Sequence, residues 1–277
     1  MIKKALVIGY GSIGQKHSNI LSKLLGEENL FVLSSQDGIK HQCIDSLDKI
    51  GQLDPDYIVV ATDTASHFNY LLEIEKTFED KIVLVEKPLF AKKEKFEGLK
   101  NKYFVGYNLR FHPLLNKLKE LIKKEEIYTV NIQCNSYLPN WRSNQDYSLT
   151  SSASKNRGGG VLLDLSHEID YLMYLVGDIE PLFSKNTKIS DLKIDSDDYL
   201  ALFGNIRQGG VFQINLNYFS RNLIRKVEIE TKDRSFELDL HNSNLIVFNS
   251  YIKHSVENQA TTEDRISLPF DLNISDS

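Results

Sequence analysis

The sequence of 277 residues has little of what marks several special classes of protein. Its two cysteines, Cys43 and Cys134, have no second Cys or His at metal-ligand spacing, which excludes a typical structural zinc site and favours a reducing compartment. No apolar run approaches the roughly 18 residues of a membrane span, and the run after Met1 is too short for a signal peptide. The net charge of -5 predicts no basic surface for nucleic acid. We therefore expect a cytoplasmic protein that binds neither membranes nor nucleic acids and holds no metal.

The first hundred residues alternate between apolar strands and helical patterns. Apolar runs predict strands over 5–8, 30–34, 56–62 and 81–86. Apolar spacing predicts helices over 12–25 and 66–78, a weak helix over 44–50 and a charged helix over 92–101. Unbroken apolar strands separated by helices indicate a parallel sheet covered on both faces.

The pattern changes after a helix that begins at Pro113. Long alternating stretches predict strands at 127–138, 198–204, 210–219, 225–231 and 235–240. One helix over 161–176 interrupts them, and the polar tail from about 253 contains no convincing helix. Such alternation indicates a mostly antiparallel sheet with one exposed face. The fold class is therefore α/β, with a doubly wound first domain over 1–105 and a second α/β domain over 106–277 for substrate and oligomer contacts.

The opening strand ends in a glycine-rich turn that leads into a helix. Its glycines have the G-x-G-x-x-G spacing of dinucleotide-binding proteins, in the setting of strand, turn and helix that this fingerprint requires. The helix N-terminus would offer free N–H groups to a pyrophosphate. The other interpretation is a glycine-rich turn without a ligand. The candidate cofactor-binding residues here are Gly9, Tyr10, Gly11, Ser12, Ile13 and Gly14.

Two further strand ends are candidates, because open parallel sheets bind ligands at the carboxyl ends of their strands. Thr62 and His67 follow the third strand, and Glu86-Lys87-Pro88 follows the fourth. A lone lysine is usually a solvated surface group. At the end of a buried strand, however, the ammonium of Lys87 would lie close to a nicotinamide and a substrate oxygen.

A second group of candidates follows three glycines at 158–160. Asp164 and His167 are spaced i, i+3 on the predicted helix, and Tyr171 continues the same stripe, which would line a cleft. Three glycines would let another molecule approach the backbone closely. A histidine here can exchange a proton near neutral pH. The alternative is a solvated helix face.

Five motifs in this order resemble the glucose–fructose oxidoreductase / inositol dehydrogenase (Gfo/Idh/MocA) family. They are residues 9–14, 61–67, 86–88, 107–113 and 158–170. The resemblance implies a Rossmann domain, a C-terminal domain with a large open sheet, and NAD(P)-dependent oxidation or reduction at a sugar or cyclitol hydroxyl. It also implies that Lys87 polarises the reacting oxygen, that His167 is the acid/base and that Asp164 supports it. The 107–113 motif adds Asn108 and Arg110 as substrate-binding candidates.

The sequence departs from the family pattern in three places. Asp164 and His167 are three residues apart, where the family commonly has four, and no helix is predicted after Tyr251. Ser34 and Ser35 occupy the region where an acidic residue usually binds the ribose of NAD. Serine would tolerate a 2′-phosphate, although no arginine follows to bind it. The cofactor is therefore NAD or NADP, with a slight preference for NADP.

The substrate is predicted only as a class. Trp141 beside Arg142 suits a sugar ring bearing a carboxylate or phosphate, although a Trp that packs the loop is an equal alternative. The segment also resembles relatives from bacterial surface-sugar pathways. The sequence thus favours an oxidoreductase acting on a sugar, nucleotide sugar or sugar acid, which assembles as a homo-oligomer through the exposed sheet. The rivals are an NAD-dependent lyase or hydrolase with transient oxidation, and a non-catalytic, dinucleotide-dependent regulatory protein.

Overall fold

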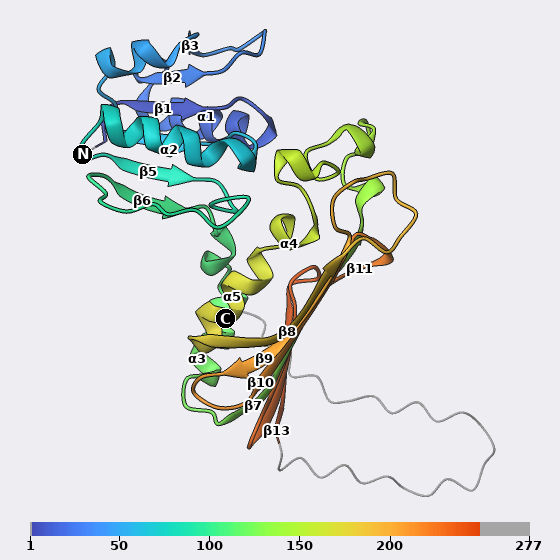
Figure 1. Ribbon diagram of the computed structural model, residues 1–277. Helices are drawn as coiled ribbons and strands as arrows, with labels where there is room; N and C mark the ends of the chain where they lie inside the picture. The colour runs from blue at the N-terminus through green and yellow to red at the C-terminus, as the bar shows by residue number, and fades with distance from the viewer. Residues whose placement is uncertain (1, 250–277) are drawn as a thin grey trace, which may run out of the picture. The chain divides into compact units, whose positions relative to one another are not determined.

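The computed structural model describes residues 2–249, apart from the side chains of Leu47 and Asp48 (Figure 1). Contacts divide the chain into two compact units, which are described separately. Unit 1 comprises residues 1–107, 144–166 and 193–197, and unit 2 comprises 108–143, 167–192 and the chain from 198 onward. Two segments of unit 1 therefore come from far along the sequence. The predictions made for the chain after Tyr251 lie outside the described residues.

Unit 1 is built on a six-stranded parallel sheet with the strand order β3-β2-β1-β4-β5-β6. The strands are β1 (Ala5–Ile8), β2 (Leu30–Leu33), β3 (Gln42–Ile44), β4 (Tyr57–Val60), β5 (Ile82–Val85) and β6 (Lys102–Val105). The order reverses between β1 and β4, both of which lie in the middle of the sheet. In doubly wound sheets, ligands bind at the carboxyl ends of the strands at this switch point.

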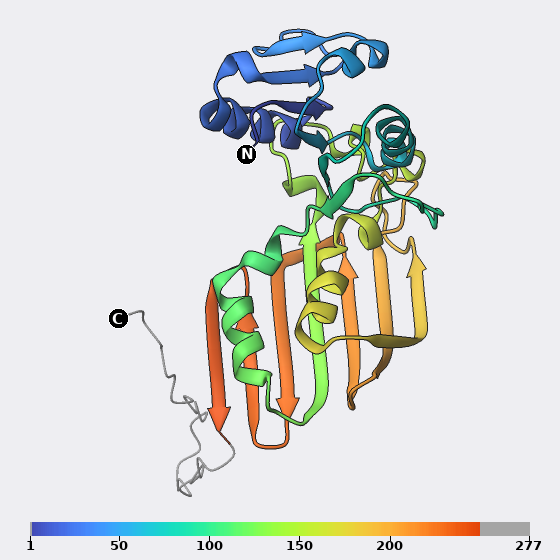
Figure 2. The ribbon, with the colours of Figure 1, turned by 90° about the vertical axis from the view of Figure 1, so that its left-hand side faces the viewer.

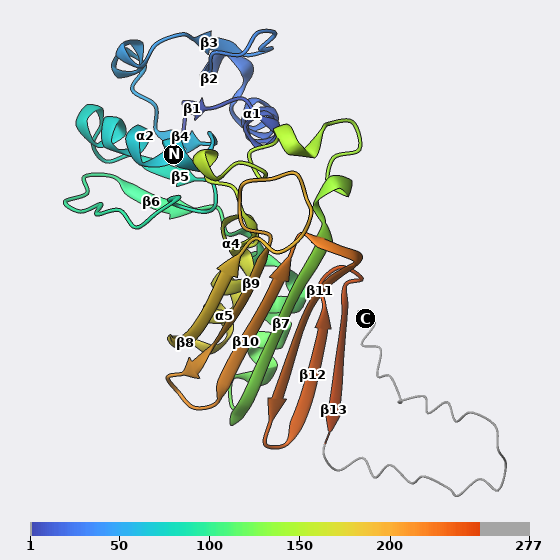
Figure 3. The same cartoon turned by 45° about the vertical axis from the view of Figure 1, so that its right-hand side comes forward.

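Helices cover both faces of this sheet, as predicted. α1 (Ser12–Leu25) packs on the face that carries Val7, and α2 (Thr64–Thr77) packs on the face that carries Ile8. Figure 3 shows the two helices on opposite sides of the strands. Shorter helical segments of this unit are η1 (Glu27–Asn29), η2 (Leu47–Gln52), η5 (Tyr147–Leu149), η6 (Lys155–Arg157) and α4 (Val161–Asp164).

Two local predictions for unit 1 were wrong. Residues 92–101 form no helix, because Phe90 and Phe96 turn inward and stack edge-on with Phe68. The weak helix over 44–50 is instead the end of β3 followed by the short helix η2. The helix predicted over 12–25 is confirmed as α1. Its apolar residues Ile20 and Leu24 are exposed, because the buried face uses small residues at 14 and 18 that let the helix lie close to the strands.

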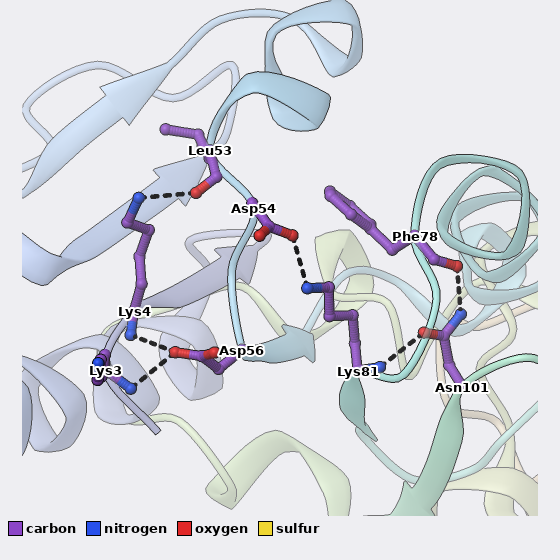
Figure 4. Close-up of polar contacts among 8 residues, drawn as sticks. All are labelled: Lys3, Lys4, Leu53, Asp54, Asp56, Phe78, Lys81 and Asn101. Atoms are coloured by element: carbon purple, nitrogen blue, oxygen red, sulfur yellow. Dashed lines mark hydrogen bonds and ion pairs between the residues drawn. The ribbon is translucent and has the colours of Figure 1, made fainter. Parts of the chain in front are cut away.

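The amino ends of the strands are joined by structural hydrogen bonds (Figure 4). The carboxylate of Asp56 accepts the backbone N–H groups of Lys3 and Lys4 at 2.8 and 3.0 Å. These two bonds lower the pKa of Asp56. At the next strand, the Asn101 side chain accepts the backbone N–H of Lys81 at 2.9 Å. Side chains of the protein therefore accept these backbone N–H groups at the amino ends of the strands.

Unit 2 contains a seven-stranded sheet in the order β13-β12-β11-β7-β10-β9-β8. The strands are β7 (Ile127–Tyr137), β8 (Ile179–Thr187), β9 (Tyr199–Ile206), β10 (Val211–Asn217), β11 (Phe219–Thr231), β12 (Arg234–Asp239) and β13 (Asn244–Asn249). β7 pairs with β10 in parallel and every other pair is antiparallel. The prediction of a mostly antiparallel sheet is confirmed, although it missed β8 and β13.

Helices cover one face of this second sheet. α3 (Pro113–Ile122) begins at Pro113 as predicted, and it lies beside α5 (His167–Val176) on the face turned toward the viewer in Figure 2. The remaining helical segments are η3 (Asn108–Phe111) and η4 (Leu138–Asn140). Val130 and Ile132 point into the core beneath the helices, whereas alternate residues of β7 are more exposed. Within residues 2–249, no helix covers the opposite face of this sheet (Figure 3).

The single helix predicted over 161–176 is two helices. α4 ends at Asp164, Leu165 leaves the helical region with φ −100° and ψ 30°, and α5 begins at His167. Asp164 and His167 therefore do not share one helical face, and the predicted i, i+3 relation does not apply. None of the helices among residues 2–249 combines the length and apolar character needed to cross a membrane.

Candidate active site

The glycine turn after β1 is shaped for close backbone contact. Gly9 has φ +95°, and a Cβ there would lie 2.6 Å from the Ala61 carbonyl oxygen. A Cβ on Gly14 would lie 2.1 Å from the Gly9 carbonyl oxygen. At Gly11, by contrast, no atom lies within 4 Å of an added Cβ. Gly9 and Gly14 are thus needed for the packing of the turn, whereas Gly11 leaves its backbone accessible to a ligand.

The N-terminus of α1 at this turn is open and uncapped. Gly11 is the N-cap, Ser12 and Ile13 are exposed, and the first turn carries no acidic side chain to oppose the helix dipole. Uncapped N–H groups at such a terminus suit the phosphates of a dinucleotide. The side chain of Tyr10 points elsewhere, because it is buried edge-on to His41 at 5.9 Å between ring centroids.

The end of β2 presents serine hydroxyls. Ser34 Oγ accepts the backbone N–H of Gln36 at 3.2 Å, and Ser35 is exposed. A hydroxyl that accepts this bond keeps its own proton to donate. The end of β2 thus offers a neutral hydrogen-bond donor where NAD-specific sites usually have a carboxylate.

The loop after β4 is held by a buried histidine. His67 is 1% exposed, its Nε2 lies 3.1 Å from the Thr62 carbonyl oxygen, and its Nδ1 lies 3.1 Å from that of Pro88. Burial lowers the pKa of His67. The ring therefore joins the loops after β4 and β5, and its burial leaves it no surface for the predicted contact with a cofactor.

Glu86 holds the strand end that carries Lys87. Its Oε1 lies 2.7 Å from Nε2 of His17 on α1, and its Oε2 accepts the backbone N–H of Lys87 at 3.3 Å. His17 was not predicted as a site residue, although it follows the glycine fingerprint by three residues. The contact thus links the helix of the glycine turn to the peptide of Lys87.

The ammonium of Lys87 lies against the segment 144–166. Its Nζ donates a hydrogen bond of 2.6 Å to the backbone carbonyl of Asp164. The same segment is tied to the start of α2 by Arg157, whose Nε lies 3.0 Å from Asp63 Oδ2. Lys87 and Asp164 do meet as the motifs suggested, but this hydrogen bond uses the main chain of Asp164.

The glycine run 158–160 does not leave room for another molecule in the way predicted. A Cβ on Gly158 would lie 2.8 Å from Cβ of Thr64, and one on Gly159 would lie 2.0 Å from the Ser151 carbonyl oxygen. A Cβ on Gly160 would lie 2.3 Å from Oδ1 of Asp197. The three glycines are required because the protein's own chain packs against them.

In unit 2, His167 is the first residue of α5 and is partly exposed. Asp170, in the same turn, receives two hydrogen bonds from Arg110, of 2.9 Å from Nε and 2.6 Å from Nη2. Arg110 was predicted to bind substrate, and both of these N–H groups are instead paired with Asp170. The neighbouring Asn108 is exposed at the start of η3.

The two aromatic substrate candidates, Tyr171 and Trp141, both pack against other residues of unit 2. Tyr171 is fully buried, so the prediction that it lines a cleft was wrong; the break before His167 changes which residues of α5 face the core. Trp141 stacks edge-on with Tyr218 at 5.1 Å, and its Nε1 donates to Ser136 Oγ at 2.9 Å. Trp141 remains 40% exposed and Arg142 is exposed beside it, so a role in binding stays a prediction.

A cavity of about 1160 Å³ also lies within unit 2. Its lining extends from α3 to the C-terminal half of α5 and the turn after β9, and includes Arg110 and Tyr174. Within the described residues, the lining does not include His167. We therefore do not assign this cavity to the candidate chemistry.

The strand order, the glycine turn and the open N-terminus of α1 define a dinucleotide-binding protein of the doubly wound class. The chain belongs to the Gfo/Idh/MocA oxidoreductase family. The model for the "Oxidoreductase family, NAD-binding Rossmann fold" matches residues 3–103, and that for the "Oxidoreductase family, C-terminal alpha/beta domain" matches residues 119–263. The protein is thus an oxidoreductase with an NAD-binding Rossmann domain.

Solved structures with similar folds include sugar and nucleotide-sugar dehydrogenases. The WlbA dehydrogenase from Bordetella pertussis, in complex with NADH and UDP-GlcNAcA, is 17% identical with a TM-score of 0.72, over 86% of this chain and 78% of that one. UDP-N-acetylglucosamine 3-dehydrogenase GnnA from Acidithiobacillus ferrooxidans is 18% identical with a TM-score of 0.72, over 91% and 79%. A levoglucosan dehydrogenase complex with NADH and levoglucosan is 18% identical with a TM-score of 0.73, over 90% and 76%. A comparison with curated proteins gives no match.

Proposed function

We propose that this oxidoreductase transfers a hydride to or from a hydroxyl-bearing carbon of a sugar or nucleotide sugar. The observation that carries the proposal is the Lys87 ammonium, held 2.6 Å from the Asp164 carbonyl oxygen after β5. Lys87 lies at the carboxyl end of β5, and the glycine turn lies at the carboxyl end of β1 in the same parallel sheet. Ligands of doubly wound sheets bind at these carboxyl ends. When bound, the nicotinamide supplies the hydride chemistry. Lys87 would donate a hydrogen bond to the reacting oxygen and stabilise the negative charge that develops there.

We assign the proton of the substrate hydroxyl to His167. It is a partly exposed imidazole at the start of α5, and an imidazole exchanges protons near neutral pH. Asp164 would assist by holding Lys87 through its main-chain carbonyl. Asn108, Trp141 and Arg142 are exposed residues of unit 2 that we propose as substrate contacts.

The substrate class rests on the structural relatives. The WlbA structure is a complex with UDP-GlcNAcA, GnnA is named as a UDP-N-acetylglucosamine 3-dehydrogenase, and the third is named for levoglucosan. The first test is NADH formation with NAD⁺ and a panel of UDP-sugars, sugar acids and free sugars. A panel on which the folded protein binds NADH but oxidises nothing, and reduces no corresponding ketone, would contradict the proposal.

The second test is His167→Asn. We expect unchanged folding and NADH affinity, with turnover lower by about 10²–10⁴-fold, which is the usual contribution of a positioned acid or base. His241→Asn is the matched control, because His241 is exposed in the turn after β12. Native turnover in the His167 variant would remove this residue from the mechanism.

We also propose that the site accepts NADP beside NAD, because Ser34 presents no negative charge to a 2′-phosphate. Ser34→Asp should weaken NADP binding and leave NAD binding nearly unchanged, since a carboxylate repels the phosphate but can accept a bond from a 2′-OH. Calorimetry with both cofactors measures the ratio of the NAD affinity to the NADP affinity. A ratio that is the same in the variant and in the native protein would mean that Ser34 does not contact the ribose.

The open sheet face of unit 2 is the basis for proposing a homo-oligomer. Phe183 on β8 is 58% exposed, and its partner in the ladder, Phe203 on β9, is 40% exposed. Contiguous apolar surface that is exposed in this way can mark an interface between subunits. Phe203→Glu should lower the mass measured by light scattering, while an unchanged mass would place the interface elsewhere. Cys43 and Cys134 are not joined in a disulfide, which fits the cytoplasm as the proposed location.

A further inference from the structure

The first turn of α5 carries two acidic side chains, and each is bound by an arginine from a distant element. Glu168 Oε1 accepts a bond of 2.8 Å from Nε of Arg225, which lies on β11. Asp170 receives two bonds from Arg110, which lies on η3. Acidic residues at a helix N-terminus are favoured by the helix dipole, but the dipole does not require buried ion pairs.

Glu168 lies in an environment that is unfavourable for a carboxylate. It is 0% exposed, and this burial raises its pKa while the adjacent Arg225 opposes the rise. Among the described residues, neither its Oε2 nor the buried hydroxyl of Tyr171 has a hydrogen-bond partner. Apolar residues of similar size often replace such a buried ion pair without loss of stability. Stability alone therefore gives little reason for the pair.

We infer that Glu168 and Arg225 are positioning residues for His167. His167 and Glu168 are consecutive in one helical turn, so an anchor on Glu168 fixes the rotation of that turn and the direction of the preceding side chain. β11 is a strand inside the sheet, flanked by β7 and β12, and it provides a rigid base for the anchor. The Asp170–Arg110 pair holds the same turn from a second side. This inference rests on the proposed role of His167.

The experiment replaces both partners at once, because removing one would leave a buried charge without a partner. In Glu168→Met, Arg225→Met we expect a folded protein with native NADH affinity and native substrate KM. Its kcat should fall by about 10²-fold, the scale of a small misplacement of a reacting group. A displacement of the His167 ring should also change its NMR shifts, a readout that does not depend on substrate.

The chain offers a closely matched control in Glu125 and Arg234. Arg234 and Arg225 each have side chains that are 28% exposed, and Glu125 is 10% exposed. That pair lies at Thr231, the last residue of β11, whereas Arg225 lies in the middle of the strand. Glu125→Met, Arg234→Met should therefore leave kcat and the His167 shifts unchanged. Arg225→Lys provides a second test if the double variant does not fold, because it retains the charge but loses the Nε donor; we expect a smaller loss of kcat.

The outcomes separate the inference from the proposed function. If His167→Asn retains native turnover, the role of His167 fails, and the inference fails with it. If His167→Asn loses turnover but both the Glu168/Arg225 double variant and Arg225→Lys keep native kcat and native His167 shifts, the inference alone is overturned. Equal losses in the Glu168/Arg225 and Glu125/Arg234 variants would also overturn it, because they would show a general effect of losing an ion pair.

Discussion

The two candidate catalytic side chains are held in different ways. In unit 1, the ammonium of Lys87 is held by a main-chain group, the carbonyl of Asp164, while the backbone N–H of Lys87 donates to the Glu86 carboxylate. In unit 2, the turn of His167 is held by side-chain ion pairs, Glu168–Arg225 and Asp170–Arg110. Main-chain contacts tolerate changes of side chain, whereas ion pairs depend on the identity of both residues. Substitutions should therefore act differently in the two units.

The largest effect is expected from a substitution in the glycine turn after β1, where the backbone itself would bind the cofactor. Gly11→Asp should abolish dinucleotide binding, because it places a carboxylate where the backbone is open to the pyrophosphate, yet the protein has space for the new Cβ. Calorimetry with NADH measures the loss. Gly14→Ala is the contrasting variant: its Cβ would overlap the Gly9 carbonyl, so we expect loss of stability as well as binding. Native affinity in a folded Gly11→Asp protein would contradict the site.

Lys87→Met should follow in size. Removing the ammonium deletes a donor to the developing alkoxide, and the loss of one such donor typically lowers kcat by about 10²–10³-fold. Melting temperature and NADH affinity should change little. Lys81→Met tests the other end of the same strand, where the ammonium pairs with Asp54 at 2.6 Å. A kcat equal in the two variants would show that the position of Lys87 has no special role.

Asp164→Asn tests directly whether main-chain contact is sufficient. The sequence alone favours a strong loss of activity, because the carboxylate is expected to support the proton relay. The hydrogen bond from Lys87 uses the main-chain carbonyl, which asparagine keeps, so we expect turnover to fall by less than about tenfold. Steady-state kinetics decides between the two. A fall of a hundredfold or more would restore the carboxylate to the mechanism.

The smallest effect is expected on stability, at the amino ends of the unit 1 strands. Hydrogen bonds from two N–H groups lower the pKa of Asp56, so its stabilising contribution is present above its unfolded pKa of about 3.9 and is lost as the pH falls through the lowered value. Asp56→Ala should cost about 1 kcal/mol near neutral pH and less in strong acid, with native kcat. Urea unfolding at several pH values measures this. A cost that is independent of pH would contradict the role of the charge.

Much of unit 1 could be predicted because its signals are local. Four apolar residues before Gly9 specify a buried strand, and the spacing to Gly14 specifies a turn into a helix that packs closely on it. Lys87 was found because it directly follows an apolar strand and precedes a proline. The helix predicted over 92–101 failed for the opposite reason: its charged periodicity is local, but Phe96 is drawn into an aromatic cluster by distant residues.

By itself, the sequence determined the two sheets, the dinucleotide turn and the family, because strand alternation, glycine spacing and the order of motifs are properties of short segments. Only the tertiary structure decided how the candidate residues are held. Arg225 is 57 positions from Glu168, and Arg110 is 60 from Asp170. The break at Leu165 and the contact of Lys87 with the Asp164 carbonyl likewise depend on how distant segments pack. No local pattern encodes such pairs, since folding brings them together.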